Sequence, residues 1–518
     1  MVSQAVVRPS LGLLTTIAVG AGLFIGSLMP YGPGLRDDSY TYIHSAEMLV
    51  GRGTYSRLTG EGDLRPVTNF PPGYPFALAL LDATGVGPFA AAKILNQILF
   101  GVFVLLIGIS LWLATGLVWP SLLGILFAVL STPLTSQFTW AQSEPLFLVL
   151  VQGGVLSLFL YLARRRNTLL LVVSGAALGM AVLTRYAGLG VVAGAVAVLV
   201  LDRRILVRRK LAESFLMLCL SLGPILLFLV RNLIVAGEAV NRPRLFWHPP
   251  PIETWASGAA AILRWALPDR WVAAVGPERG LLGAIVGMVV VCAILIRVLF
   301  APLGQEDNAR RPLAMAKVLS GSALGYLGLI VVTLLFVDRL TPLNDRILVP
   351  LHLFLLQMAA VGAALVAQDS TRNARLLTSV AAIAWVGLYG FREVALVHAL
   401  REDGQGYSGR TWRESEVLHF VCGLPEVPIY SNDIPAVYFA CGRHVRPLPS
   451  STNLASQEDN PGYSAEVAAL REAVLHQDGV IAIIGWYGDE RLARLGIDQA
   501  LGDLEPRAVF EDGIVYGR

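Results

Sequence analysis

The chain has 518 residues, of which 55% are hydrophobic and only 15% are charged. Its mean hydropathy is +0.62, which is too apolar for a soluble domain with a charged surface, so most of the chain is expected to face lipid. The formal net charge of +3 is small and the basic residues form short clusters between apolar runs. This pattern is typical of topology signals in a membrane protein and implies no nucleic-acid partner. The four cysteines lack the spacing of zinc ligands, which argues against a metal cluster.

Apolar runs of membrane-spanning length recur along the first 400 residues. A hydrocarbon core of about 30 Å requires about 20 residues of helix, since each residue rises about 1.5 Å. The sequence predicts eleven spans, at 11–29, 89–113, 118–134, 145–162, 168–183, 187–201, 212–233, 281–300, 318–337, 347–367 and 376–396. The fifth and sixth runs are short, and only Thr184, Arg185 and Tyr186 separate them. They could therefore form one broken element instead of two spans.

The distribution of basic residues predicts the orientation in the membrane. Arginine and lysine gather in alternate loops, as at 164–166 and 203–210, whereas the short loops on the other side carry only Arg185, Arg339 and Arg346. By the positive-inside rule the N-terminus is cytoplasmic and everything after residue 396 is extracytoplasmic, in a multi-pass protein of the cell (inner) membrane. A single crossing over 168–201 would separate the two basic clusters, so a hairpin of two spans is favoured.

Two outer loops and the tail are too long to be simple connections. The loops at 30–88 and 234–280 are expected to form interfacial helices and binding surfaces, and the second is rich in tryptophan and proline. We divide the chain into a membrane domain at 1–400 and an extracytoplasmic domain at 401–518. In the latter, short strands at 427–430, 480–486 and 508–516 alternate with helical patterns at 413–420 and 465–476, which predicts a small α/β fold.

The first outer loop contains a pair of carboxylates close to the membrane. Asp37 and Asp38 follow the first span by a few residues, and 39–50 has the spacing of a helix that lies along the interface. Such a pair could perform acid–base chemistry at headgroup depth. Alternatively, both residues could cap that helix, since acidic side chains favour the first helical turn.

Other charged residues stand at the predicted outer ends of spans. Glu144 precedes a long apolar run, where an acidic group is costly unless it has a partner or a function, although Pro145 makes a simple helix start there plausible. Arg185, Arg231 and Arg346 could bind a phosphate, or they could anchor the chain to lipid headgroups by snorkelling.

Several short motifs, taken in order, resemble those of the GT-C superfamily of polytopic membrane glycosyltransferases, which includes protein mannosyltransferases and the lipid A aminoarabinose transferase. The resemblance rests on the Asp37–Asp38 pair with the amphipathic helix after it and on four further segments. These are the Pro-Pro-Gly-Tyr-Pro sequence at 71–75, Ser-Glu-Pro-Leu-Phe at 143–147, Thr-Arg-Tyr at 184–186 and Asn-Asp-Arg at 344–346. It implies a GT-C fold of about 11 transmembrane helices that transfers a sugar from a polyprenyl-phosphate donor, with inversion, to an acceptor on the outer face.

The resemblance also implies roles for individual residues. Asp37 would be the general base that activates an acceptor hydroxyl, with Asp38 and Glu144 as acidic partners. Arg185, Arg346 and Arg231 would bind the donor phosphate. Tyr40, Tyr74 and His248 are further candidates for contact with substrate, although a lone histidine such as His248 is more often packed or solvated. A divalent metal, Mg or Mn, would be held by Asp37 and Glu144 if one is present. The sequence has Pro71 where the aminoarabinose transferase has a lysine at the donor phosphate, so the donor could differ here.

Other interpretations remain open at this point. A transporter or flippase would be expected to carry ionisable residues at mid-membrane and duplicated halves, and a noncatalytic assembly protein would have no need of paired acids. In the tail, Ser431, Asn432 and Asp433 could bind a ligand at a sheet edge or could form a helix cap. Cys422 and Cys441 would form a disulfide outside the cytoplasm or remain two free thiols.

Overall fold

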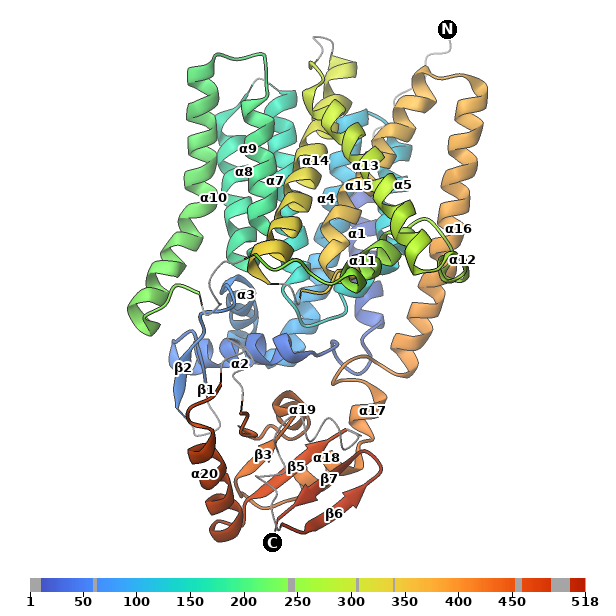
Figure 1. Cartoon of the computed structure of the whole chain (residues 1–518). Helices are drawn as coiled ribbons and strands as arrows, with labels where there is room; N and C mark the ends of the chain where they lie inside the picture. The colour runs from blue at the N-terminus through green and yellow to red at the C-terminus, as the bar shows by residue number, and fades with distance from the viewer. Residues whose placement is uncertain are drawn as a thin grey trace.

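The computed structural model of this chain describes residues 11–58, 63–164, 166–240, 247–303, 307–338, 341–451, 459–485 and 504–517. Arg165, Arg339 and Trp486, which the sequence analysis used, lie outside these ranges. The described chain forms a bundle of long helices with a small mixed-sheet domain at one end (Figure 1).

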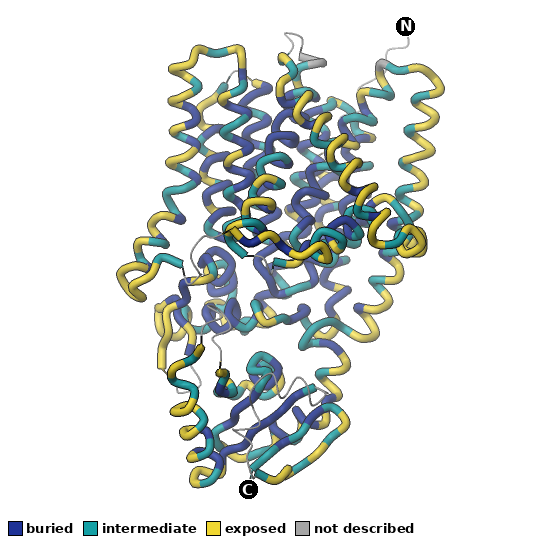
Figure 2. Tube along the Cα trace, viewed as in Figure 1, coloured by how far each residue is buried: buried dark blue, intermediate teal, exposed yellow. Residues whose placement is uncertain are grey.

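The bundle consists of apolar helices at every predicted span. Seven helices are long and apolar enough to cross a membrane, and four apolar helices are shorter. In chain order they are α1 (Leu11–Ser27), α4 (Pro88–Thr115), α5 (Val118–Leu130), α7 (Glu144–Ala163), α8 (Thr168–Thr184), α9 (Gly188–Val200), α10 (Val207–Ala236), α13 (Pro277–Phe300), α14 (Asp307–Val332), α15 (Asp345–Asp369) and α16 (Arg372–Glu402). The chain is therefore a multi-pass membrane protein. Figure 2 shows that the outer helices α13 and α16 are largely exposed, as expected where apolar helices face lipid.

The fifth and sixth spans are two antiparallel helices. Arg166, before the start of α8, forms an ion pair with Asp202, which follows the end of α9. The beginning of one helix and the end of the next thus lie at the same end of the bundle, and the hairpin prediction is confirmed.

Basic residues from three connections meet at this same end. Arg166 forms a second ion pair with Glu213, at 2.7 Å. Arg204 and Arg310 donate hydrogen bonds to the carbonyl of Leu162, at 3.4 and 2.9 Å. The positive clusters that the sequence places in the cytoplasm therefore lie together, opposite the end of the bundle at which α7 and α15 begin.

Glycines allow the central helices to approach closely. A Cβ at Gly194 of α9 would lie 2.1 Å from the carbonyl oxygen of Gly321 in α14, and one at Gly325 would lie 2.2 Å from the carbonyl oxygen of Gly190. Small residues spaced four apart permit backbone contact between helices, which is how apolar helices associate in lipid.

The two long loops predicted to lie outside form short elements across one end of the bundle. The first contains α2 (Asp37–Arg52), the antiparallel hairpin β1 (Ser56–Leu58) and β2 (Leu64–Pro66), α3 (Gly73–Leu81) and the π-helical turn η1 (Asp82–Val86). The second contains α11 (Ile252–Arg264) and α12 (Asp269–Val275), and α6 (Thr132–Gln137) and η2 (Thr333–Val337) lie in other connections. Helix α2 lies between the bundle and the C-terminal domain (Figure 1).

The C-terminal domain is built on a five-stranded mixed sheet. The strand order is β4-β3-β5-β7-β6, with β3 parallel to β4 and β5, and with β7 antiparallel to β5 and β6. The elements are α17 (Arg410–Arg413), α18 (Glu416–Cys422), β3 (Ile429–Ser431), α19 (Ile434–Cys441), β4 (Arg446–Pro447), α20 (Tyr463–His476), β5 (Val480–Ile484), β6 (Pro506–Phe510) and β7 (Gly513–Tyr516). The predicted single strand at 508–516 is wrong, because a turn at residues 511 and 512 divides it into the β6–β7 hairpin.

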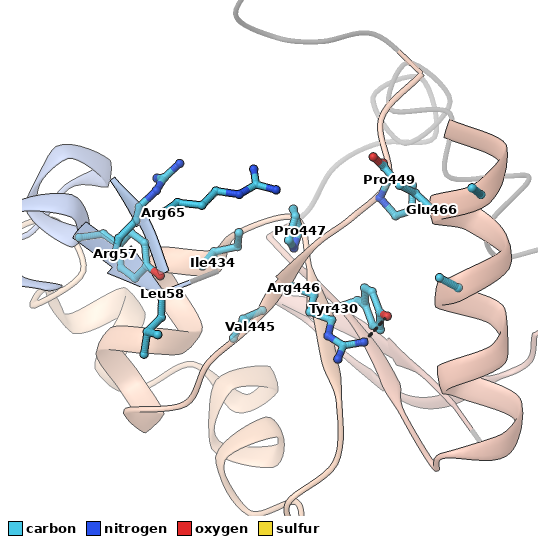
Figure 3. A pocket seen from close by; sticks show the side chains of 13 residues that line it. Arg57, Leu58, Arg65, Tyr430, Ile434, Val445, Arg446, Pro447, Pro449 and Glu466 are labelled. Atoms are coloured by element: carbon cyan, nitrogen blue, oxygen red, sulfur yellow. Dashed lines mark hydrogen bonds between the residues drawn. The ribbon is translucent and has the colours of Figure 1, made fainter. Parts of the chain in front are cut away.

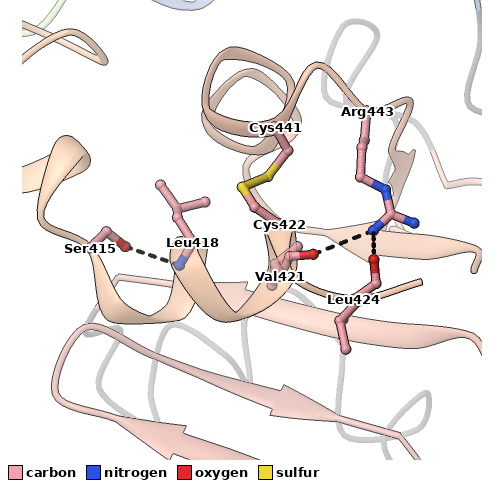
Figure 4. The surroundings of a disulfide bond; sticks show 7 residues. All are labelled: Ser415, Leu418, Val421, Cys422, Leu424, Cys441 and Arg443. Carbon is pink, nitrogen blue, oxygen red and sulfur yellow. Dashed lines mark hydrogen bonds between the residues drawn. A yellow bond between two sulfur atoms is a disulfide. The ribbon is translucent and has the colours of Figure 1, made fainter. Parts of the chain in front are cut away.

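A disulfide joins Cys422 at the end of α18 to Cys441 at the end of α19, with Cα atoms 5.1 Å apart (Figure 4). The two remaining cysteines, Cys219 and Cys292, are free. Disulfides persist in oxidising compartments, which agrees with the extracytoplasmic position predicted for this domain.

Removal of this disulfide is expected to destabilise the C-terminal domain. The bridge closes a loop of 19 residues, which corresponds to about 3 kcal/mol in the chain-entropy model. The variant Cys422→Ser with Cys441→Ser should therefore be cut within this domain about two orders of magnitude faster in limited proteolysis. Cys219→Ser on α10 is the matched control and should leave the rate unchanged. Alkylation of both Cys422 and Cys441 in unreduced protein would contradict the bridge.

Candidate functional site

The acidic pair lies in the first turn of α2, but its two side chains point to different partners. Arg36 precedes the helix, and its backbone N–H donates to Ser39 Oγ at 3.0 Å, which fixes the helix start. Successive residues of a helix differ by about 100° in direction. As a result Asp38 points toward α15 of the membrane bundle, whereas Asp37 points toward the C-terminal domain.

Asp38 belongs to a group of four charged side chains, together with Glu144, Arg185 and Arg346, which we call the ion cluster. Arg346 Nη2 lies 2.6 Å from Asp38 Oδ2, and its Nε donates to Glu144 Oε1. Arg185 Nη1 lies 2.6 Å from the same Glu144 oxygen. Residues that are far apart in the sequence, at the starts of α2, α7 and α15 and at the end of α8, therefore meet at one point.

The cluster is only partly accessible. Glu144 is 2% exposed, whereas the side chains of Arg185 and Arg346 are 18% and 21% exposed. Arginine has five N–H donors, and the contacts of these two side chains with the described residues leave Nε and Nη2 of Arg185 and Nη1 of Arg346 without a partner. The cluster thus retains donors that an anion could engage.

Polar side chains beside the cluster have unused hydrogen-bonding capacity. Tyr42 OH lies 3.2 Å from Ser143 Oγ, which also accepts from Arg185 at 3.0 Å. Tyr74 packs edge-on against Tyr42 with ring centroids 5.3 Å apart. Among the described residues, neither the buried Tyr74 hydroxyl nor Glu144 Oε2 has a hydrogen-bond partner. Buried polar atoms normally have partners, so these two atoms favour a site that is completed by a ligand or water.

Local sequence explains how these elements meet. Gly73 opens α3 against the end of α8, where a Cβ would lie 2.6 Å from Thr184 Oγ1, so the Pro-Pro-Gly-Tyr-Pro and Thr-Arg-Tyr motifs pack together. Asn344 caps α15 by accepting from the N–H of Ile347 at 3.3 Å, which places Arg346 in the first turn. The short motifs therefore position one another.

Asp37 is held by the C-terminal domain. Tyr407 OH lies 2.7 Å from Asp37 Oδ1 and 3.0 Å from Asp433 Oδ1. Burial of the Tyr407 hydroxyl and the neighbouring carboxylates raise its pKa, so it remains protonated and donates its one hydrogen to one carboxylate at a time. Burial also raises the pKa of Asp433. Asp37 itself is exposed and forms no ion pair with the residues that the structure describes.

Tyr407 was not predicted from the sequence. It lies in the connection after α16 and carries no motif, so only the fold brings it to Asp37. Asp433, by contrast, was predicted as a possible cap and is one: its carboxylate accepts from the N–H of Ala436 at 3.0 Å. Asn432 bridges to the backbone of Ile484 and thereby joins the ends of β3 and β5.

Three other predicted residues lie outside the ion cluster. Arg231 donates to the carbonyls of Val67 and Tyr55, at 3.0 and 2.8 Å, and so holds the first outer loop. His248 is buried, and its backbone N–H donates to the carbonyl of Leu335 in η2. Tyr40 lies on the face of α2 that contacts the C-terminal domain, 5.0 Å from Tyr438 between ring centroids.

The acidic residues do not fit a shared divalent cation. Asp37 hydrogen bonds to Tyr407, whereas Glu144 Oε1 is already bound by two guanidinium groups, whose positive charge opposes a metal ion. The described ranges of the chain contain no group of three His, Cys, Asp or Glu side chains arranged to hold a metal. Asp37 and Glu144 are therefore not arranged to hold Mg or Mn between them.

Comparison with known proteins identifies the fold. No protein-family model and no characterised sequence matches this chain. Among solved structures, ArnT from Cupriavidus metallidurans in the apo state matches with 16% identity over 97% of both chains and a TM-score of 0.50. The same protein bound to undecaprenyl phosphate matches with 14% identity over 98% of both chains, also with a TM-score of 0.50.

A third match is the archaeal oligosaccharyltransferase AglB from Archaeoglobus fulgidus, in complex with an inhibitory peptide and a dolichol-phosphate. It has 10% identity over 91% of this chain and 69% of AglB, with a TM-score of 0.50. These identities are low, but the matches extend over nearly the whole chain and include the C-terminal domain. The chain has the fold of the GT-C membrane glycosyltransferases.

Proposed function

We propose that this protein is an inverting glycosyltransferase that moves a sugar from a polyprenyl-phosphate donor to an acceptor at the outer face of the cell (inner) membrane. The observation that carries the proposal is the ion cluster. It holds two arginines that retain free donors at one end of an apolar bundle, and the exposed carboxylate of Asp37 comes directly before Asp38 of the cluster on the same helix.

The arginines suit the leaving group of this reaction. A polyprenyl phosphate keeps its chain in lipid and its phosphate at headgroup depth. Arg185 directly follows α8 and Arg346 lies in the first turn of α15, at the ends of apolar helices where such a phosphate would be bound. Planar guanidinium groups bind phosphate oxygens through paired N–H donors and stabilise negative charge that develops on them. Glu144 and Asp38 fix the two arginines before the donor arrives. ArnT with undecaprenyl phosphate and AglB with dolichol-phosphate show that this fold accommodates such carriers.

Asp37 suits the general base better than Asp38 does. Asp38 Oδ2 is bound to Arg346 Nη2 at 2.6 Å, so this oxygen is already engaged and is not available to an acceptor hydroxyl. Asp37 keeps an exposed oxygen for an acceptor hydroxyl. In the proposed step this carboxylate takes the hydroxyl proton as the acceptor oxygen attacks the anomeric carbon. The bond from that carbon to the phosphate oxygen breaks on the opposite face, and polyprenyl phosphate leaves. The anomeric carbon of the product therefore has the inverted configuration.

Topology supports an outer location for this chemistry. The ion cluster lies at the opposite end of the bundle from the joined basic clusters around Arg166, Arg204 and Arg310, which the positive-inside rule assigns to the cytoplasm. The disulfide in the adjoining domain supports the same orientation, with the N-terminus cytoplasmic.

The first prediction separates the two acids of α2. Asp37→Asn should lower sugar transfer by about 10² or more, because a positioned base is lost, while donor binding stays within about twofold. Asp38→Asn should instead weaken donor binding, because Arg346 loses a partner. Both quantities can be measured with purified protein and a radiolabelled polyprenyl-phosphate sugar. Near-normal transfer by Asp37→Asn would remove Asp37 as the base.

The second prediction concerns the donor phosphate. Arg346→Ala should weaken binding of polyprenyl phosphate by about tenfold or more, since charge-assisted hydrogen bonds are each worth about 1.5–3 kcal/mol. Acceptor binding should change little. Arg279→Ala, an exposed arginine in the first turn of α13, is the matched control. Equal donor affinity in wild type and Arg346→Ala would exclude Arg346 from the site.

A further inference from the structure

A cavity of about 600 Å³ lies between the β1–β2 hairpin and the C-terminal domain. Arg57 and Arg65 of the hairpin line one side, Tyr430 and Arg446 line the sheet side, and Glu466 of α20 lies across from the hairpin (Figure 3). A volume of this order is typical of small-molecule sites. No residue of the ion cluster lines it.

The arginines that make the cavity positively charged also repel one another across the hairpin. Arg57 and Arg65 are cross-strand partners in the register of β1 and β2, so their side chains share one face of the hairpin. Like charges directly opposite one another destabilise a strand pair. Neither guanidinium forms a hydrogen bond or ion pair with the residues that the structure describes, and both are exposed. An anion between them would relieve this repulsion.

The third arginine is already oriented toward the cavity wall. Arg446 Nη1 donates to Tyr430 OH at 2.9 Å, and its guanidinium lies 5.5 Å from the Tyr430 ring centroid. Tyr40 of α2 also lines the cavity. Aromatic rings beside arginines suit a sugar that carries a negative charge, because the rings cover its apolar face while the guanidinium groups bind the anion.

Helix α2 connects this cavity to the proposed base. Tyr40, which lines the cavity, follows Asp37 by three residues and therefore lies on the same helix face, with Cβ atoms about 5–6 Å apart in such pairs. Asp38 and Tyr42 lie on the other face, toward the ion cluster. A ligand in the cavity would therefore approach Asp37 from the side opposite the donor phosphate.

From this arrangement we propose that the cavity binds the acceptor, and that the acceptor is a saccharide carrying a phosphate or carboxylate group close to the hydroxyl that is glycosylated. The identification of the ligand as the acceptor rests on the proposed function, whereas the binding of an anionic saccharide in this cavity does not depend on it. Arg57 and Arg65 would bind the anion, with Arg446 beside them, and Tyr40 and Tyr430 would pack against the sugar.

Equilibrium binding to full-length protein in phosphatidylcholine nanodiscs tests this directly. The probe is trehalose 6-phosphate, compared with trehalose. The phosphorylated sugar is expected to bind at least tenfold more tightly, and the Arg57→Gln, Arg65→Gln double variant is expected to lose at least tenfold in affinity for it. Arg507→Gln, an exposed arginine on β6 outside the cavity, is the control and should change affinity less than twofold.

Three results of the affinity measurements would overturn the proposal. They are equal affinity for the two sugars, no loss in the double variant, and an equal loss in Arg507→Gln. Without ligand, the unfolding midpoint of the double variant should equal or exceed that of wild type, because a like-charge pair is removed. A loss of binding together with a lowered midpoint would count against the site. Phosphatidylglycerol in the nanodiscs should not compete with the probe, since competition would assign the cavity to a lipid headgroup. Failure of the Asp37→Asn or Arg346→Ala tests would leave these binding results unaffected.

Discussion

The carboxylate of Glu144 is buried in an apolar bundle and shared between two guanidinium groups, and much of the site depends on this contact. Burial of a charge is costly, and removal of one partner from a buried ion pair typically costs about 3–5 kcal/mol. Glu144 therefore fixes the positions of α8 and α15, which supply Arg185 and Arg346, relative to α7. A site prepared in this way needs little rearrangement when a phosphate binds.

Helix α2 connects this membrane site to the C-terminal domain. One face carries Asp38 and Tyr42 toward the ion cluster, and the other carries Asp37 and Tyr40 toward Tyr407 and the cavity. The C-terminal domain is thus part of the proposed site, because Tyr407 orients the carboxylate that would act as base.

Sequence reasoning could predict the features that depend on local pattern. Runs of apolar residues located the helices of the bundle, and basic clusters such as those around Arg166 and Arg204 predicted the hairpin of α8 and α9. Motif order identified Asp38, Glu144, Arg185 and Arg346 as candidates. The order of the motifs does not predict that Asp37 and Asp38 face different partners, because their directions depend on the rotation of α2 about its axis. Tyr407 and the pairing of Arg57 with Arg65 depend on tertiary contacts and on strand register, which a single sequence does not encode in any local signal.

The proposed function requires that Arg185 and Arg346 bind the phosphate of a polyprenyl carrier. A cryo-electron microscopy structure of the protein in nanodiscs with polyprenyl phosphate tests it most directly. We expect phosphate oxygens within about 3 Å of guanidinium nitrogens of both arginines, with the polyprenyl chain between apolar helices and Asp37 open toward the C-terminal domain. A phosphate bound elsewhere, with the ion cluster unchanged and both arginines out of reach, would contradict it.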